Sequence, residues 1–193
     1  DTKFEKLFEH YNDTFTFLQE YTKSRERLFL WALIVVGIMF LDVTTAIDST
    51  KIAAEFIEKK AGIKILIKPS FIGSMLWFFL LSIIVRYFQF NILVRRQYSY
   101  IHQLEDNLCV FGGDYFHREG KAYFKDYPVF AKWTWFLYTI VFPALLMSVM
   151  IFKVYNEYLI RNSLGMSFFV DIILFVMSLI SVLLYWLQIH FKK

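Results

Sequence analysis

Apolar residues along this chain gather into long runs that charged residues barely interrupt. Four runs approach the roughly 20 residues that an α-helix needs to cross the ~30 Å hydrocarbon core of a bilayer. They cover Leu28–Ile47, Phe71–Val94, Trp133–Phe152 and Met166–Phe191. The pattern therefore predicts an all-α integral membrane protein with four transmembrane helices, folded as a single membrane domain over residues 1–193.

The segment before the first run, residues 1–27, predicts a helix outside the membrane. Its apolar residues alternate at spacings of four and three, which is the period of a coiled coil. They are Phe4, Phe8, Tyr11, Phe15 and Leu18. Three interpretations stay open: this stripe packs on the chain's own middle loop, lies on the membrane, or self-associates around a symmetry axis.

The segment after the second run predicts a helical middle loop that continues the second membrane helix. Residues 95–108 contain no proline or glycine to end a helix. Tyr98, Ile101, Leu104 and Leu108 share one face at helical spacing, so they are expected to be packed against another element.

Composition and charge agree with a membrane protein and give it an orientation. The chain is 58% hydrophobic and 21% aromatic, with a formal net charge of +4. Soluble domains contain fewer apolar residues, about 45–50%. Most Lys and Arg residues flank the spans on the side of residues 1–27, the middle loop and the C-terminus. The positive-inside rule then predicts that both termini are cytoplasmic.

No sequence motif of an enzyme, cofactor site or metal site is present. Cys109 is the single cysteine of the chain, and the four histidines are scattered. His102 and Glu105 lie three residues apart, a weak pattern for a metal site. Arg96 and His102 enclose five residues, the spacing seen in one class of ribonucleases. We therefore expect no enzyme, cofactor or metal, with a membrane-tethered ribonuclease as the weakest alternative.

Charged residues within the predicted spans are candidates for a function at membrane depth. They are Asp42, Arg86 and Asp171. An exposed charge at the bilayer centre costs at least ~2.5–3.5 kcal/mol, so these side chains should face protein or water, or extend to the headgroups. For Arg86, two interpretations are equally supported: it lines a water path, or it makes a structural hydrogen bond. For Asp42 and Asp171, anchoring at the headgroups is favoured. Pro143 interrupts the third span, either as a gating hinge or as a tolerated transmembrane proline.

Basic residues form a collar at the predicted cytoplasmic face. The candidate ligand-binding members are Lys23, Arg25, Arg27, Arg95 and Arg96, and Lys132 flanks the third span. Such a collar sets topology and contacts anionic lipid. Multiplied by symmetry, it would instead form a positive vestibule that attracts a nucleotide or oligonucleotide. Stacking faces for bases would come from Tyr21, Tyr98 and Tyr100.

Several short sequences carry a resemblance to a known group of proteins. They are Tyr100–Glu105, Arg118–Tyr123, Tyr127-Pro128, Trp133 and Phe142-Pro143. In these segments and in its four spans, the chain resembles small bacterial inner-membrane proteins of antiphage defence. The channel effector of the Hailong system is the nearer of these, and the membrane subunit of the Kiwa system is the second.

The resemblance implies a homo-oligomer, expected to be a tetramer, in the bacterial inner membrane. In the Hailong case, an oligonucleotide made by a partner nucleotidyltransferase holds the channel shut. Our first hypothesis is therefore an oligomeric ion channel gated from the cytoplasmic side by an anionic ligand. The rival hypothesis is a non-conducting anchor or sensor that recruits a soluble partner protein.

Overall fold

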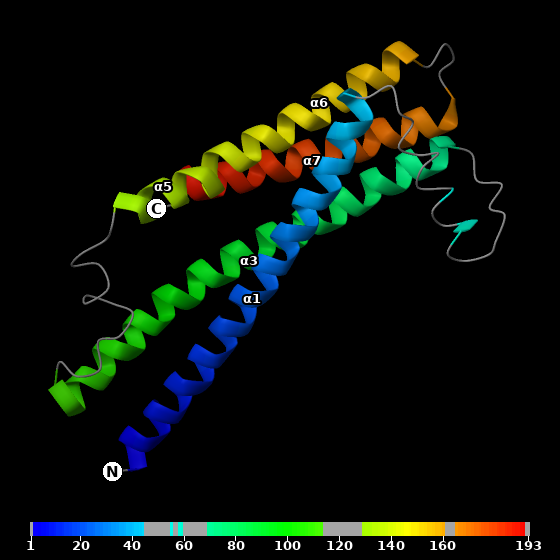
Figure 1. Ribbon diagram of the computed structural model, residues 1–193. Helices are drawn as coiled ribbons and strands as arrows, with labels where there is room; N and C mark the ends of the chain where they lie inside the picture. The colour runs from blue at the N-terminus through cyan, green and yellow to red at the C-terminus, as the bar shows by residue number, and fades with distance from the viewer. Residues whose placement is uncertain are drawn as a thin grey trace. The chain divides into compact units, whose positions relative to one another are not determined.

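The computed structural model describes residues 2–44, 55, 58–59, 69–113, 129–160 and 165–191. Within these ranges the long elements are all helical. They are α1 (Thr2–Thr44), α3 (Pro69–Gly112), α5 (Val129–Phe136), the π-helix η2 (Leu137–Val141), α6 (Phe142–Ile160) and α7 (Met166–Phe191) (Figure 1). The all-helical fold class is thus confirmed.

Three of the described helices are long and apolar enough to cross a membrane. They cover Gly73–Phe111, Lys132–Leu159 and Met166–Ile189. The predicted spans in residues 71–94, 133–152 and 166–191 fall largely on them. The predicted first span reaches Ile47, beyond the last described residue of α1, so its length lies partly outside the described residues.

Helices α1 and α3 both extend beyond an apolar span, as the sequence predicts for α3 but not for α1. The predicted N-terminal helix and the described part of the first span form one helix, α1, because Lys23–Arg27 contains good helix formers and no proline or glycine. The second span and the helical part of the middle loop likewise form one helix, α3. The rest of the middle loop, residues 114–128, lies outside the described residues.

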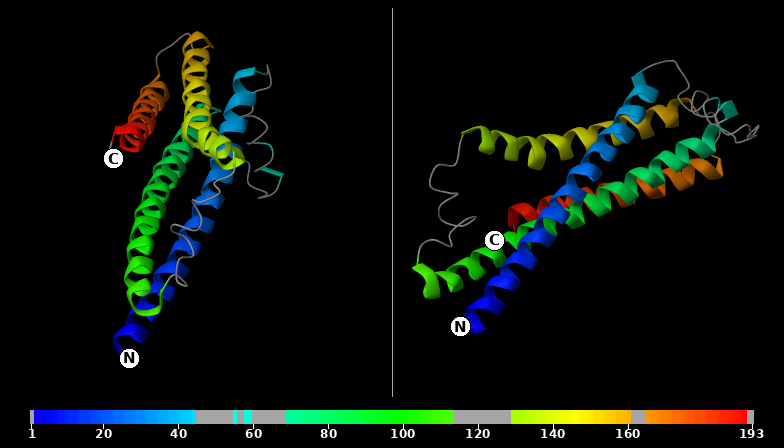
Figure 2. Two further views of the ribbon diagram at one scale, coloured as in Figure 1. Left: turned by 90° about the vertical axis from the view of Figure 1, so that its left-hand side faces the viewer. Right: turned by 60° about the horizontal axis from the view of Figure 1, so that its bottom comes forward.

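The internal contacts of the chain define two compact units. Unit 1 comprises Asp1–Leu28 and Tyr87–Phe136, and unit 2 comprises Phe29–Arg86 and Leu137–Lys193. Within unit 1, residues 2–28 of α1 run beside residues 87–112 of α3 in the opposite direction (Figures 1 and 2). We call these two segments the helix pair.

Unit 2 has an apolar interior and an apolar exterior. Its buried residues include Met39 of α1, Trp77 of α3, Leu146 of α6 and Val182 of α7. Large apolar side chains also cover its outside, among them Trp31, Phe78, Phe152, Ile173 and Leu184. A helix that is hydrophobic on all sides is typical of a membrane environment, which agrees with the three apolar helices.

Candidate ligand groove and buried charges

The helix pair is held together by the apolar faces that the sequence predicts. Its buried cluster contains Tyr11 and Leu18 of α1 together with Val94, Ile101, Leu104 and Leu108 of α3. Phe4, Leu7, Phe15, Tyr21 and Tyr98 pack against this cluster. The aromatic stripe of α1 therefore packs on the chain's own α3, which is one of the three interpretations left open by the sequence.

One buried carboxylate lies inside this aromatic core. Glu105 has no exposed surface, and the Tyr11 hydroxyl donates a hydrogen bond of 3.2 Å to its Oε1 atom. A buried carboxylate is costly unless it is hydrogen-bonded. The bond fixes the register of α1 against α3, because these two side chains meet at one position of the two helices.

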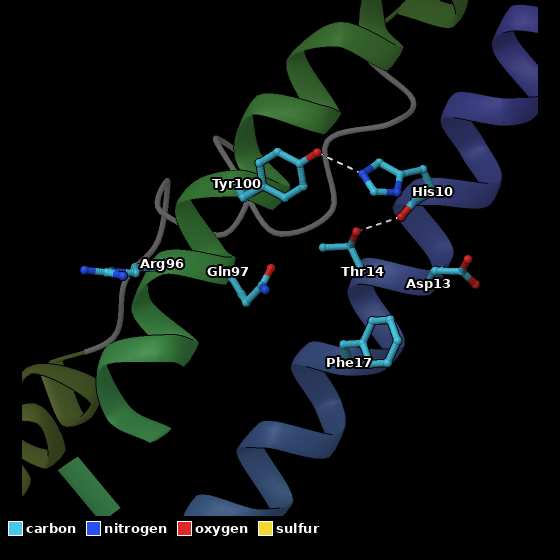
Figure 3. A pocket seen from close by; sticks show the side chains of 7 residues that line it. All are labelled: His10, Asp13, Thr14, Phe17, Arg96, Gln97 and Tyr100. Atoms are coloured by element: carbon cyan, nitrogen blue, oxygen red, sulfur yellow. Dashed lines mark hydrogen bonds between the residues drawn. The ribbon is translucent and has the colours of Figure 1, made fainter. Parts of the chain in front are cut away.

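A cavity of about 440 Å³ opens on one flank of the helix pair (Figure 3). Seven side chains line it: His10, Asp13, Thr14 and Phe17 from α1, and Arg96, Gln97 and Tyr100 from α3. The α1 residues follow one another at spacings of three, one and three, so they share a helix face beside the aromatic stripe. The cavity falls in the range of ~300–1,000 Å³ typical of small-ligand sites.

Hydrogen bonds order the inner wall of this cavity. The Nε2 atom of His10 and the hydroxyl of Tyr100 lie 2.8 Å apart, and their rings meet edge to face. The Thr14 hydroxyl donates to the backbone carbonyl of His10 at 2.7 Å. Figure 3 shows the His10 and Tyr100 side chains pointing toward one another across the two helices. The contact between His10 and Tyr100 therefore joins the two helices along one wall of the cavity.

The remaining lining residues offer a mixed binding chemistry. Arg96 supplies a guanidinium, Gln97 an amide, and Phe17 and Tyr100 exposed aromatic rings. The Asp13 carboxylate and the Arg96 guanidinium lie on opposite flanks, each directed away from the centre (Figure 3). Because Arg96 is exposed and has a flexible stem, its guanidinium can turn toward a ligand. The combination suits a small anion that carries a planar ring.

The predicted basic collar is brought into one unit but is divided along it. All five candidate ligand residues lie in the helix pair. Arg96 lines the cavity, whereas Arg95 is exposed beside it. Lys23 is six residues beyond Phe17 on α1, about 9 Å farther along the helix. The sequence suggests a single collar, because both basic runs flank predicted spans. The antiparallel register of the helix pair instead places Lys23–Arg27 and Arg95–Arg96 at different levels.

The other two candidate ligand residues of α1, Arg25 and Arg27, make local contacts. Arg25 lies 3.9 Å from Glu26. Arg27 donates a hydrogen bond of 3.3 Å to the Ser24 hydroxyl. Both contacts are between neighbouring turns or residues of α1 in a solvent-exposed setting, so they contribute little to stability and leave both guanidinium groups near the surface of the helix.

The three tyrosines proposed as stacking faces lie in different surroundings. Tyr100 lines the cavity as the sequence suggests. Tyr21 packs on Phe90 with ring centroids 5.8 Å apart, and Tyr98 packs on the core next to His102. The sequence alone does not single out five other lining residues: His10, Asp13, Thr14, Phe17 and Gln97. Their signal was the run of helical spacings on α1, which was hidden by the stronger aromatic stripe.

The charged residues predicted at membrane depth belong to unit 2. Asp171 of α7 is buried, with 1% of its surface exposed. Arg86 of α3 is exposed. Asp42 lies in α1, but its side chain lies outside the described part of the structure. The burial of Asp171 agrees with a side chain that faces protein, rather than one that extends to the headgroups.

A buried ion pair lies in α6 near the level of Asp171. Lys153 and Glu157 of α6 are 3.2 Å apart, with side chains only 5% and 9% exposed. Tyr158 of α6 contacts Phe168 of α7, and α6 and α7 run in opposite directions, so Asp171 lies between the levels of Lys153 and Glu157. The sequence alone does not indicate this pair, because Lys153 directly follows the predicted third span, where a basic residue normally faces the headgroups.

Pro143 follows a local change of helix type. The five residues Leu137–Val141 form a π-helix, and α6 begins directly after it at Phe142. Proline has no N–H to donate, and its ring clashes with the carbonyl four residues earlier in an α-helix. In this chain that carbonyl belongs to Thr139, which lies in the π-helix. Phe29 packs on Tyr138 within the π-helix and on Phe142 directly after it.

The described residues contain no group of three or more His, Cys, Asp or Glu side chains that could hold a metal ion. Arg96 lines the cavity, but His102, six residues later, does not. Comparison with known proteins found no matching protein family, curated protein or solved structure.

Proposed function

We propose that this protein is a subunit of an oligomeric membrane channel that is gated by an anionic ligand bound in the cavity of the helix pair. The ligand is a nucleotide or a short oligonucleotide in the cytoplasm. The antiphage role, the inner membrane and the cytoplasmic termini suggested by the resemblance are part of this proposal.

The observation that carries the proposal is the composition of the cavity. It combines Arg96, which suits a phosphate, with the exposed rings of Phe17 and Tyr100, on which a base can stack. His10 and Gln97 add hydrogen-bonding groups on the same walls. A cavity that served packing alone would not need a cation and two exposed rings among its lining residues.

The continuity of the helices supports a link between ligand and membrane. Arg96, Gln97 and Tyr100 lie on α3, the same unbroken helix that begins at Pro69 with apolar residues. His10 and Phe17 lie on α1, which also continues into apolar residues. A ligand that favours one spacing of the helix pair thereby favours one arrangement of both helices, which is the requirement for gating by differential affinity.

The test is ion flux from liposomes that contain the purified protein, with and without added mononucleotides and short oligonucleotides. We expect a nucleotide to change the flux and Arg96→Gln to weaken that effect about tenfold or more, since a charge-assisted contact contributes ~1.5–3 kcal/mol. Lys23→Gln is the matched control, because it removes one exposed positive charge from the same unit but does not line the cavity.

Three outcomes would contradict parts of the proposal. Equal effects of Arg96→Gln and Lys23→Gln would assign binding to general electrostatic attraction rather than to the cavity. Flux that no nucleotide alters would keep the channel and remove this ligand. No flux from a folded oligomer would favour the second function.

That second function is a non-conducting anchor or sensor for a soluble partner. The observation that favours it is the exposed apolar surface of unit 1, where Val110, Val129 and Phe130 are 80%, 83% and 76% exposed. On the cytoplasmic side that we propose for unit 1, exposed apolar side chains are typical of a protein interface. Capture of one stoichiometric soluble protein by the wild type, lost in Val110→Asp, would support it.

A further inference from the structure

The helix pair carries opposite charges on its two outward faces. On α1, the middle of the side away from α3 is acidic: Glu9, Asp13 and Glu20 are exposed and lie roughly opposite the buried Tyr11 and Leu18. The exposed basic residues of this side, Lys6, Lys23 and Arg27, lie nearer its two ends. On α3, Arg95 and Arg96 are exposed and lie on either edge of the side away from α1. Figure 3 shows this polarity directly for Asp13 and Arg96, which point outward on opposite sides.

The level of each charge along the pair follows from four contacts between the two helices. These contacts join Phe4 with Phe111, His10 with Tyr100, Tyr11 with Glu105, and Tyr21 with Phe90. Arg95 is midway between Phe90 and Tyr100, so its level on α1 is close to Thr16. Arg95 and Arg96 therefore lie between the levels of Asp13 and Glu20, within about two turns of helix.

We infer that α1 of one copy of this chain packs against α3 of the next copy, with Glu20 and Asp13 facing Arg95 and Arg96. A rotation about an axis along the helix pair keeps every residue at its own level, so the charges that match in level would meet. A two-fold contact of α1 with α1, or of α3 with α3, would instead bring like charges together, which is unfavourable. The inference rests on the oligomer of the proposed function and names its contact.

This contact is head-to-tail, because each copy uses a different face toward each neighbour. Contacts of this kind generate rings when the rotation closes and filaments when it does not. In a membrane, all copies share one orientation, so a closed ring around an axis normal to the membrane is the compatible solution. Glu20 and Arg95 do not line the cavity, whereas Asp13 and Arg96 do, so the contact between copies and the ligand site share these two side chains.

Chemical cross-linking tests the contact while it keeps every charge. Thr16 and Ser99 are exposed, neutral and central on the two outward faces. In a Cys109→Ser background, Thr16→Cys and Ser99→Cys are made in separate chains, and each is treated with a short bismaleimide in membranes. We expect no dimer from either variant alone, dimers from their mixture, and a ladder that ends at the ring size when both cysteines are in one chain.

Charge exchange then tests the cause of the contact. In the mixture, we expect Arg95→Glu in the Ser99→Cys chain to reduce the yield of dimer at least fivefold, and Glu20→Arg in the Thr16→Cys chain to restore it. Dimers from a single cysteine variant would overturn the head-to-tail contact in favour of a two-fold one. No dimer from the mixture would also overturn it, even if the nucleotide-dependent flux of the proposed function were observed, so the two proposals fail separately.

Discussion

Lys153 and Glu157 place two opposite charges inside an otherwise apolar unit, with Asp171 at the same level. Removing ions from water costs several kcal/mol each, and the pair recovers this through its short separation. The pair therefore adds little net stability as long as both charges are present. The stability of unit 2 should instead depend strongly on whether the charges balance.

We predict that Lys153→Met destabilises the protein by about 3–5 kcal/mol, because it leaves the buried Glu157 carboxylate without its ammonium partner. The double variant Lys153→Met/Glu157→Met should recover most of that loss. The measurement is the free energy of unfolding in detergent micelles. A double variant as unstable as Lys153→Met would contradict the balance of charges and assign the loss to altered packing.

The residues that sequence reasoning found and missed differ in their surroundings. Tyr98, Ile101, Leu104 and Leu108 were predicted to share a packed face, and the structure confirms this, because burial follows helical periodicity. His10 and Gln97 were missed, since the residues of a cavity come from two helices whose register depends on contacts such as Tyr11 with Glu105. A single helix pattern contains no information on that register.

At the scale of elements, α1 and α3 are longer than the spans that hydropathy delimits. Hydropathy changes at Leu28 and near Val94, but the backbone continues as a helix through both points. A change from apolar to charged side chains alters what surrounds a helix without removing any backbone hydrogen bond. Helix ends need a proline, a glycine or a cap, and neither point offers one.

Pro143 has the opposite effect on the element before it. We predict that Pro143→Ala slows amide hydrogen exchange in residues 137–143, because the new N–H can donate to the Thr139 carbonyl and continue an α-helix. Exchange is measured by mass spectrometry in nanodiscs. If the π-helix also serves as the gating hinge, the same variant will reduce nucleotide-dependent flux.

The matched control for this prediction is Pro69→Ala. Pro69 is the first residue of α3, where a backbone N–H would have no acceptor within the helix. The Pro69→Ala variant should leave amide hydrogen exchange unchanged in α3 and in residues 137–143. Unchanged exchange in Pro143→Ala would mean that packing of Phe29 on Tyr138 and Phe142, rather than the proline, holds the π-helix.

At the scale of the whole molecule, the proposals depend on which side of the membrane holds the cavity. A nucleotide reaches the cavity only if the helix pair is cytoplasmic, as the positive-inside rule predicts. Val110 on α3 is 80% exposed and lies ten residues beyond Tyr100, so it reports on the side of the cavity. We predict that Cys109→Ser/Val110→Cys is not labelled by a membrane-impermeant maleimide in intact spheroplasts, but is labelled in inverted vesicles. Labelling in intact spheroplasts would place the cavity outside the cell and contradict gating by a cytoplasmic nucleotide. The head-to-tail contact between copies would be unaffected, because it depends on the faces of α1 and α3 and not on the side of the membrane where the helix pair lies.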